Sequence, residues 1–446
     1  MPKLIIPNAY ELYKPEGSPV NQDEAIARQF YNARFLWLLE PGDIILLPEL
    51  PAEGFLAYLA SLKQIELKSF TVLTWGKELN SSVSEVLSDS SLIERLQTMI
   101  SAPTSWSIQT CFFNQSVMKL AESLNIPIEP NWRRLVQQDF VRHMNSKANF
   151  RNLAESHDLP IPKGQVCLSS QSFIQAIQTL LKVTGQVIIK QEHNGGGRGN
   201  IGITIDSEKT FSGVIKTIVI NDKQSIAEIA QQLWANYVDN LNQQLIVEVY
   251  YPKKGTFTTM LQLSPLDQPP VLLNYSEIRM ESTWVGVQIP AHALLPHQVE
   301  KLVSASMKLA HVLQAYGYQG YLCCDAILSC DNIILFTEIN VRPGAETHAH
   351  TLASHLFGKD YSKQTTILTR MGMKVSSFSR VYQMLKDQGL LLSPDNPSGV
   401  AILTVDDRYS NQIEYLVAAP DLTSAYTLEN QLMLLLQGCS ERIEYI

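Results

Sequence analysis

Apolar and amphipathic segments alternate through the first 140 residues of the chain. Short, nearly continuous apolar runs such as KLIIPN, DIILLPEL and FTVLTW are separated by segments with apolar residues at helical spacing, such as DEAIARQFYNARFLWLL. Strands buried on both faces and linked by helices are typical of a parallel sheet in an α/β domain. We therefore predict an α/β domain over residues 1–140, in which SSVSEVLSDSSLIERLQTMI forms one helix and SWSIQTCFF one strand.

The pattern changes near residue 131, where a long helical stretch, NWRRLVQQDFVRHMNSKANFRNLAESHD, ends at Leu-Pro-Ile-Pro. It is followed by a helix (SSQSFIQAIQTLLKV), a strand (GQVIIKQ), a glycine-rich loop (HNGGGRGN) and a second strand (IGITID). Later segments predict a smaller set of strands and helices after residue 373. We predict a middle domain over residues 141–373 and a C-terminal α+β segment over residues 374–446.

A β-hairpin is predicted in the stretch GYLCCDAILSCDNIILFTEINVRPGAETH, where two apolar runs flank the turn-forming residues 329–332. Because side chains alternate along a strand, a turn with an even number of residues places Asp325, Glu338 and Asn340 on one face, whereas an odd turn separates them. Two carboxylates and an amide oxygen are suited to Mg²⁺ beside a phosphate. The alternative is that all three are solvated residues on an exposed sheet face.

The composition of the 446 residues, with 45% hydrophobic and 17% charged residues, is that of a globular protein. The net charge of −8, without a basic stripe, argues against a general nucleic-acid binder. No apolar run of about 18 residues and no secretory leader are recognisable, so we expect a cytoplasmic protein without a membrane partner. The six cysteines lack metal-finger spacing and are expected to be free thiols.

The loop HNGGGRGN connects a strand to a strand, unlike the Walker and dinucleotide-binding loops, which lead directly into a helix. Its glycines allow backbone N–H groups to approach phosphate oxygens, and Lys190 precedes it on the strand. We interpret the loop as a cover over a nucleotide. The alternative is a mobile hairpin tip.

Two further residues have open interpretations. The strand QQLIVEVYYP can hold an adenine ring through its backbone, with Glu248 accepting a hydrogen bond from the base or from a ribose hydroxyl. Alternatively, Glu248 is a sheet residue paired with a lysine. Lys147 begins a predicted helix after Asn-Ser, and taken alone it is interpreted as a solvated helix lysine.

Taken in order, these motifs are a helix lysine before Leu-Pro-x-Pro, a strand lysine before a glycine-rich loop, a strand glutamate, and a hairpin carrying Asp and then Glu-x-Asn-x-Arg. This succession, between residues 140 and 360, resembles the ATP-grasp superfamily, in which two α+β lobes hold ATP. The N-terminal third is similar to the pre-ATP-grasp domain of ligases that build peptide natural products. The resemblance implies a pre-ATP-grasp α/β domain, a two-lobed ATP-grasp fold and a small α+β tail.

The resemblance also implies roles for individual residues. The ATP phosphates would be contacted by Lys147 and Lys190 and covered by the loop containing Asn194, Gly195, Gly196, Gly197 and Gly199. The adenine hinge would consist of Glu248 and the backbone of Val249 and Tyr250. Mg²⁺, or Mn²⁺ in its place, would be held by Asp325, Glu338 and Asn340, and catalysis would involve Arg342 and Lys190. Many members have an acidic residue for the ribose after the hinge, where this chain has Tyr-Pro-Lys-Lys.

The function implied by the resemblance is an ATP- and Mg²⁺-dependent ligase that activates a carboxylate as an acyl phosphate and couples it to an amine, an amino acid or a peptide. Its products would be ADP and phosphate. Alternatives are phosphoryl transfer to another acceptor, coupling to a thiol, and a nucleotide-binding regulatory protein without turnover. The complete set of metal ligands argues against the last of these. The sequence leaves open whether the chain is a monomer or a homodimer.

Overall fold

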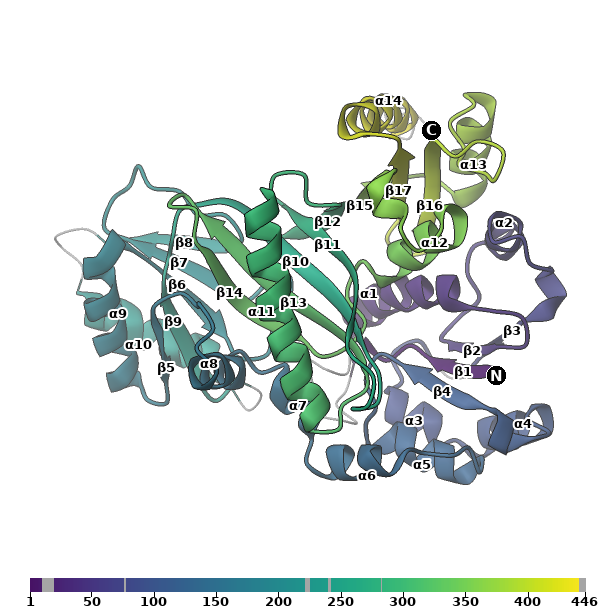
Figure 1. The fold of residues 1–446 in the computed structure, drawn as a ribbon, viewed down its shortest axis with the longest axis horizontal. Helices are drawn as coiled ribbons and strands as arrows, with labels where there is room; N and C mark the ends of the chain where they lie inside the picture. The colour runs from purple at the N-terminus through teal and green to yellow at the C-terminus, as the bar shows by residue number, and fades with distance from the viewer. Residues whose placement is uncertain (10–19, 76–77, 221–224, 240–241, 282, 441–446) are drawn as a thin grey trace. The chain divides into compact units, whose positions relative to one another are not determined.

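The computed structural model describes residues 1–9, 20–75, 78–220, 225–239, 242–281 and 283–440, and its ribbon is drawn in Figure 1. The chain forms two compact units. The first comprises Met1–Asp139, Gly286–Pro290 and Ala345–Ile446, and the second comprises Phe140–Val285 and Ala291–Gly344. Within the described ranges, no helix is long and apolar enough to cross a membrane.

The N-terminal part of the first unit is built on a parallel four-stranded sheet with the order β3-β2-β1-β4. The strand residues of one sheet face, such as Leu4 and Ile44, pack with helices into one core. Those of the other face, such as Ile5 and Ile45, are also buried, as the nearly continuous apolar runs predicted. The strands are β1 (Lys3–Ile6), β2 (Ile44–Leu47), β3 (Thr71–Thr74) and β4 (Ser107–Thr110). The helices are α1 (Gln22–Ala33), η2 (Arg34–Leu38), α2 (Phe55–Leu62), η3 (Leu67–Ser69), α3 (Val83–Leu87), α4 (Ser90–Met99), η4 (Pro103–Ser105), α5 (Gln115–Ser123) and α6 (Pro130–Gln137).

Two segments that were each predicted to form one long helix are divided into shorter helices. The segment expected to form one helix before residue 100 is divided into α3 and α4, because the Asp89 side chain accepts hydrogen bonds from the N–H groups of Ser91 and Leu92 and so begins a new helix. The stretch after residue 131 forms α6, α7 (Phe140–Met144) and α8 (Lys147–Ser156). Ser146 caps α8 by accepting from the N–H of Asn149. Polar capping residues inside an amphipathic pattern therefore divided both stretches.

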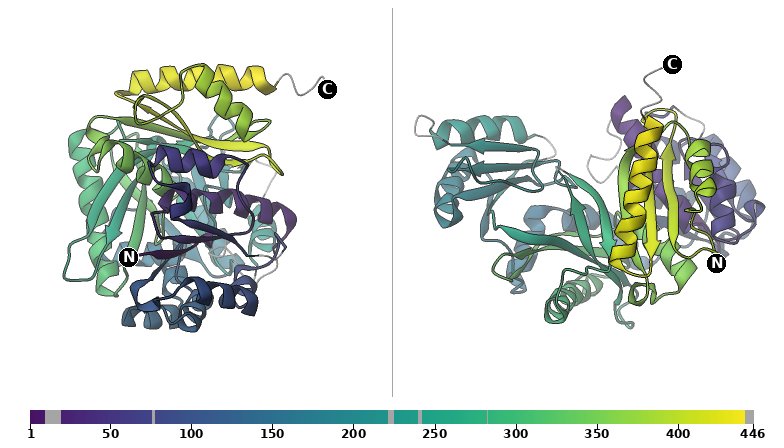
Figure 2. Two further views of the ribbon diagram at one scale, coloured as in Figure 1. Left: turned by 90° about the vertical axis from the view of Figure 1, so that its right-hand side faces the viewer. Right: turned by 90° about the horizontal axis from the view of Figure 1, so that it is seen from above.

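The C-terminal part of the first unit contains β15 (Thr366–Lys374), β16 (Gly399–Asp406) and β17 (Gln412–Ala419), which pair antiparallel. The end of β12 (Trp284–Ile289) pairs with β15. The long helix α14 (Leu422–Ser440) packs on β15 and β17, as the view from above in Figure 2 shows. The remaining helices are α12 (Thr347–Phe357), η5 (Tyr361–Lys363) and α13 (Phe378–Asp387).

The second unit has two lobes, each with its own sheet. In the smaller lobe, α9 and α10 pack together beside a five-stranded sheet with the order β5-β9-β6-β7-β8. The helices are α9 (Ser170–Thr184) and α10 (Ile226–Tyr237). The strands are β5 (Gly164–Cys167), β6 (Gln186–Gln191), β7 (Asn200–Thr204), β8 (Lys216–Val219) and β9 (Leu245–Val249).

The larger lobe is an antiparallel sheet covered by one long helix, α11 (Pro296–Ala315). Its strands run in the order β14-β13-β10-β11. The helix buries Leu302, Leu309 and Leu313, and Thr259 of the sheet bonds to Ser306 of the helix at 2.8 Å. The strands are β10 (Lys253–Leu263), β11 (Val271–Met280), β13 (Gly320–Ser329) and β14 (Ile334–Asn340).

Five cysteines are described, and all five are free thiols, as the sequence predicted. Cys111, Cys167, Cys323 and Cys324 are buried, whereas Cys330 is exposed. Cys439 lies outside the residues whose side chains are described. The four buried thiols act as small apolar groups in the core.

Candidate active site

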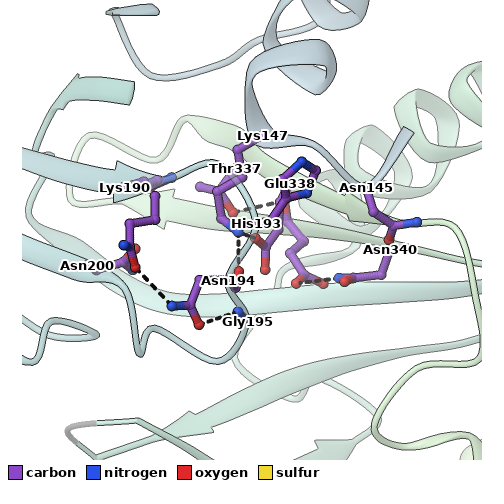
Figure 3. Close-up of polar contacts among 12 residues, drawn as sticks. Asn145, Lys147, Lys190, His193, Asn194, Gly195, Asn200, Thr337, Glu338 and Asn340 are labelled. Carbon is purple, nitrogen blue, oxygen red and sulfur yellow. Dashed lines mark hydrogen bonds and ion pairs between the residues drawn. The ribbon is translucent and has the colours of Figure 1, made fainter. Parts of the chain in front are cut away.

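The predicted hairpin of β13 and β14 is present and places Asp325 directly opposite Glu338. Asn340 lies two residues further along β14, and its Nδ2 donates to Oδ2 of Asp325 at 3.2 Å. Arg342 then donates from Nη2 to Oδ1 of Asn340 at 2.9 Å. The two carboxylates, the amide and the guanidinium therefore form one connected group, part of which is seen in Figure 3.

The turn of this hairpin contains an odd number of residues. The N–H of Ser329 bonds to the carbonyl of Ile333, so residues 330–332 form an odd loop, and Asn332 in it has φ of 64°. An odd loop by itself would put the carboxylates on opposite faces of the sheet. A bulge leaves Thr337 without a residue opposite it, and this extra residue restores the pairing of Asp325 with Glu338. The grouping that the sequence linked to an even turn is thus reached by an odd turn together with a bulge.

Lys147, at the start of α8, reaches this group of side chains. Its Nζ lies 2.8 Å from Oε2 of Glu338 and also donates to the carbonyl oxygen of Asn194 in the glycine-rich loop (Figure 3). The Lys147 side chain is only 10% exposed, so it is not the solvated helix lysine of the alternative interpretation. Burial acts to raise the pKa of Glu338, but the ammonium groups of Lys147 and Lys190 hold that pKa below its usual range.

Lys190 belongs to a buried row of alternating charges. Its Nζ lies 2.7 Å from Oε2 of Glu248, whose Oε1 is 3.1 Å from Nη1 of Arg151. Both carboxylate oxygens of Glu248 thus face cations, which favours the interpretation of Glu248 as a sheet residue paired with a lysine. Sequence reasoning missed Arg151, although it lies one turn after Lys147 on the same helix, a spacing that places side chains on one face.

The expected hinge strand offers fewer free donors than its proposed role requires. The N–H of Val249 donates to the carbonyl of Lys163 at 2.8 Å, and the N–H of Tyr250 donates to the carbonyl of Gln186 at 3.0 Å. Neither N–H is free for an adenine ring in this structure. Lys253, just beyond the hinge, is half-buried, and burial together with the Lys190 ammonium lowers its pKa to about 8.

The glycine-rich loop joins the antiparallel strands β6 and β7, as predicted. Gly196 and Gly197 have positive φ values of 64° and 82°, and a Cβ on Gly197 would lie 3.1 Å from the carbonyl oxygen of Gly213. The carbonyl of Gly196 accepts from the N–H of Trp284 at 3.2 Å. The positive φ favours glycine at both positions, and the close approach of the Gly213 backbone adds to this at Gly197. The loop therefore has defined contacts within the second unit rather than being a hairpin tip without neighbours.

The oxygen-rich group on the hairpin fits a hard cation in its donor chemistry. Asp325 and Glu338 supply carboxylates, Asn340 supplies an amide, and the ammonium of Lys147 already lies against Glu338. The amide oxygen of Asn340 accepts from Arg342, so its amide group must turn to offer that oxygen beside Asp325. Among the described residues, no group of three or more His, Cys, Asp or Glu side chains is placed to hold a metal ion. Any metal bound at the hairpin would therefore need oxygen ligands from water or a phosphate as well.

Comparisons with known proteins agree with this architecture. A family model described as the pre-ATP-grasp domain matches residues 32–126. Comparison with curated protein sequences gives no match. The fold is similar to an ADP complex of PurK, an N5-carboxyaminoimidazole ribonucleotide synthetase, with a TM-score of 0.57, 10% identity, and coverage of 98% of this chain and 97% of the other.

Two biotin carboxylase structures are also similar. The enzyme from Campylobacter jejuni, in a complex with β,γ-ATP, gives a TM-score of 0.55 at 14% identity over 95% of this chain and 89% of the other. The biotin carboxylase domain of Hydrogenobacter thermophilus 2-oxoglutarate carboxylase, with MgADP, ADP and bicarbonate, gives 0.52 at 13% identity over 94% and 86%. Residues 32–126 therefore match the pre-ATP-grasp domain, and the chain has an ATP-grasp-like fold of mixed α/β and α+β architecture.

Proposed function

We propose that this protein is an ATP- and Mg²⁺-dependent ligase that activates a carboxylate as an acyl phosphate and couples it to an amine, with an amino acid or a peptide as substrate. The observation that carries the proposal is the position of Lys147. Its ammonium joins the carbonyl of Asn194 in the glycine-rich loop to the carboxylate of Glu338 on the hairpin. One cation thus links the loop assigned to the phosphates with the strand assigned to the metal.

In this proposal the protein's own residues bind, orient and neutralise charge. Lys147 and Lys190 contact the phosphates, and the loop from Asn194 to Gly199 covers them. Glu248 holds Lys190 in place through the 2.7 Å ion pair. The hinge role of the strand around Val249 and Tyr250 is retained as a proposal.

Asp325, Glu338 and Asn340 would hold Mg²⁺, for which Mn²⁺ is expected to substitute. The metal supplies charge neutralisation between the phosphates when it is bound. Arg342 follows the last ligand on the strand and donates to Asn340 at 2.9 Å, which sets its guanidinium beside the metal ligands. We assign it to the acceptor carboxylate or to the transferred phosphoryl group, because a guanidinium matches the geometry of both anions.

A second candidate substrate is bicarbonate. A solved structure with the same fold contains bicarbonate together with MgADP. Bicarbonate and an organic carboxylate would both attack the γ-phosphorus of ATP through an oxygen atom. The two candidate substrates therefore differ only in the pocket that would be needed to hold them. The net charge of −8 without a recognisable basic stripe favours a small-molecule substrate over a nucleic acid.

The experiment that tests the proposal is a screen for phosphate release that depends on added substrate. Amino acids, dipeptides and bicarbonate are each supplied with ATP and Mg²⁺, alone and with candidate amines. We expect one carboxylate to stimulate release in the wild-type protein and not in the Glu338→Gln variant. Nucleotide binding without stimulation by any of these compounds would favour the regulatory alternative.

A further inference from the structure

A buried carboxylate lies at the base of the glycine-rich loop, outside the groups considered so far. Glu192 is 8% exposed, and its Oε1 accepts hydrogen bonds from Oγ of Ser146 at 2.5 Å and from Nε2 of Gln244 at 2.7 Å. Nε2 of His193 lies 3.7 Å from the same Oε1, and the pKa of that imidazole is lowered to about 4 mainly by burial. The two hydrogen bonds that Glu192 accepts come from a hydroxyl and a carboxamide, which are uncharged donors.

A buried polar side chain is stable where it is hydrogen-bonded, and Glu192 makes its two side-chain hydrogen bonds at the start of α8 and beside β9. Its position explains what it does. Ser146 is the N-cap of α8, and its hydroxyl donates to Glu192 while accepting from the N–H of Asn149 at 3.2 Å. The next residue, Lys147, donates its backbone N–H to the carbonyl of Glu192 at 3.3 Å. Glu192 therefore holds the first turn of α8 by both its side chain and its backbone.

The same short segment also holds the far end of the lysine. Asn194, two residues after Glu192, accepts from Nζ of Lys147 through its carbonyl oxygen. Between them, the N–H of His193 donates to Oδ1 of Asn242 at 2.9 Å, and Asn242 is itself buried. Residues 192–194 thus hold Lys147 at its backbone and at its ammonium, and they are tied to the β9 side of the lobe through Gln244 and Asn242.

We propose that Glu192 is a positioning residue for Lys147 and for the base of the loop. It acts through its acceptor oxygen, which joins the N-cap of α8 to the strand that leads into the loop. This inference rests on the proposed function for its consequence in nucleotide binding, but the placement of Lys147 is a property of the protein alone. When the Glu192 acceptor oxygen is removed, Ser146 loses its hydrogen bond and the first turn of α8 is no longer held. The Lys147 ammonium then leaves its position between Asn194 and Glu338.

The first test needs no nucleotide. The rate at which an N-hydroxysuccinimide ester acylates Lys147 is measured by mass spectrometry, with the exposed Lys163 as the internal reference. We expect a rate several-fold higher in Glu192→Ala than in the wild type. The rate in Glu192→Gln should stay near that of the wild type, because the amide retains an acceptor oxygen. An unchanged rate in folded Glu192→Ala would overturn the proposal. Should that variant fail to fold, Ser146→Ala takes its place with the same expectation, and an unchanged rate there counts equally against the proposal.

The second test is a double-mutant cycle with a non-hydrolysable ATP analogue. Glu192→Ala should weaken binding about tenfold or more, comparable with the loss of one charge-assisted hydrogen bond, and should have little further effect in the Lys147→Met background. Glu228→Gln, an exposed carboxylate on α10, is the matched control and should bind like the wild type. Additive losses would overturn the positioning role. If the wild type itself binds no nucleotide, the proposed function fails, and the acylation rates alone decide the role of Glu192.

Discussion

The ammonium of Lys147 lies 2.8 Å from a carboxylate oxygen of Glu338, where a metal ion bound to the hairpin would also need that oxygen. The two side chains are 10% and 23% exposed, so the pair is largely shielded from solvent. In the proposed site, lysine and metal would therefore compete for the same carboxylate while no phosphate is present. A nucleotide that drew the lysine to its phosphates would release Glu338, so metal and nucleotide would each favour binding of the other.

We expect Lys147→Met to raise the affinity for Mn²⁺ in the absence of nucleotide. The gain should be about tenfold or more, since the competing charge-assisted hydrogen bond is worth about 1.5–3 kcal/mol. Electron paramagnetic resonance of free Mn²⁺ measures the affinity directly. Lys163→Met, which removes an exposed lysine, is the control and should match the wild type. Equal Mn²⁺ affinities in the wild type and in Lys147→Met would contradict the competition.

Lys190→Ala should weaken binding of a non-hydrolysable ATP analogue far more than Lys163→Ala does. A desolvated lysine–phosphate contact is charge-assisted, and its loss costs about 1.5–3 kcal/mol. The variant also leaves Glu248 with Arg151 as its cationic partner, so thermal melting must accompany the calorimetric titration. Indistinguishable affinities for the two folded variants would remove Lys190 from the nucleotide site.

Glu338→Gln and Asn340→Asp should reduce turnover much more than stability. Loss of a metal carboxylate removes several kcal/mol of transition-state stabilisation. The folding cost should be small, because the Glu338 side chain is partly exposed on the sheet face rather than part of the apolar core. Turnover per folded molecule is compared with the melting temperature. A large drop in melting temperature with normal turnover would make Glu338 a structural residue.

The nucleotide product should be ADP, because attack on the γ-phosphorus by a carboxylate gives an acyl phosphate. Hydroxylamine added with the correct carboxylate should trap this intermediate as a hydroxamate without the amine partner. Arg342→Ala should depress hydroxamate formation while leaving ATP binding nearly intact, since we assign Arg342 to the acceptor side. Detection of AMP by chromatography would exclude the acyl-phosphate route, and an unchanged hydroxamate rate would exclude the role of Arg342.

The first unit contains a buried charge cluster that should make its stability depend on pH. Glu414 is fully buried and accepts two hydrogen bonds from Arg34, at 2.8 and 3.0 Å, and His348 lies 3.2 Å away. Burial acts to raise the pKa of Glu414, but Arg34 and His348 lower it to about 2. Because the folded pKa is below the unfolded one, the stabilisation is present above the ordinary pKa of 4.5 and is lost as the pH falls toward 2.

The free energy of unfolding should therefore fall as the pH decreases below 4.5, by roughly 3 kcal/mol in total for this one group. The pKa of His348 is also lowered, chiefly by burial, which adds to the loss at acidic pH. Denaturant titrations between pH 3 and pH 6 measure the slope. Glu414→Gln should show a shallower dependence than the wild type over this range, and parallel curves would exclude the cluster as its source.

The sequence by itself determined the order and the type of the parts that make the candidate site. Three of these parts are local features: the hairpin, the glycine-rich loop between two strands, and the helix that begins at Lys147. Each is determined by the spacing of apolar residues, by turn residues or by a capping residue, and each is present in the structure. The predicted fold class, a pre-ATP-grasp domain with an ATP-grasp-like fold, was confirmed. It could be predicted because the order of helices and strands along the chain restricts the architectures available.

Only the tertiary structure decided which side chains meet. Asp325 faces Glu338 because a bulge at Thr337 corrects an odd turn, and no turn residue indicates that bulge in advance. Glu248 is engaged by Arg151, 97 positions away, and Glu414 by Arg34, 380 positions away. The physical reason is that a carboxylate's partner is chosen by burial and distance in space, whereas periodicity along the chain fixes only the face on which it lies.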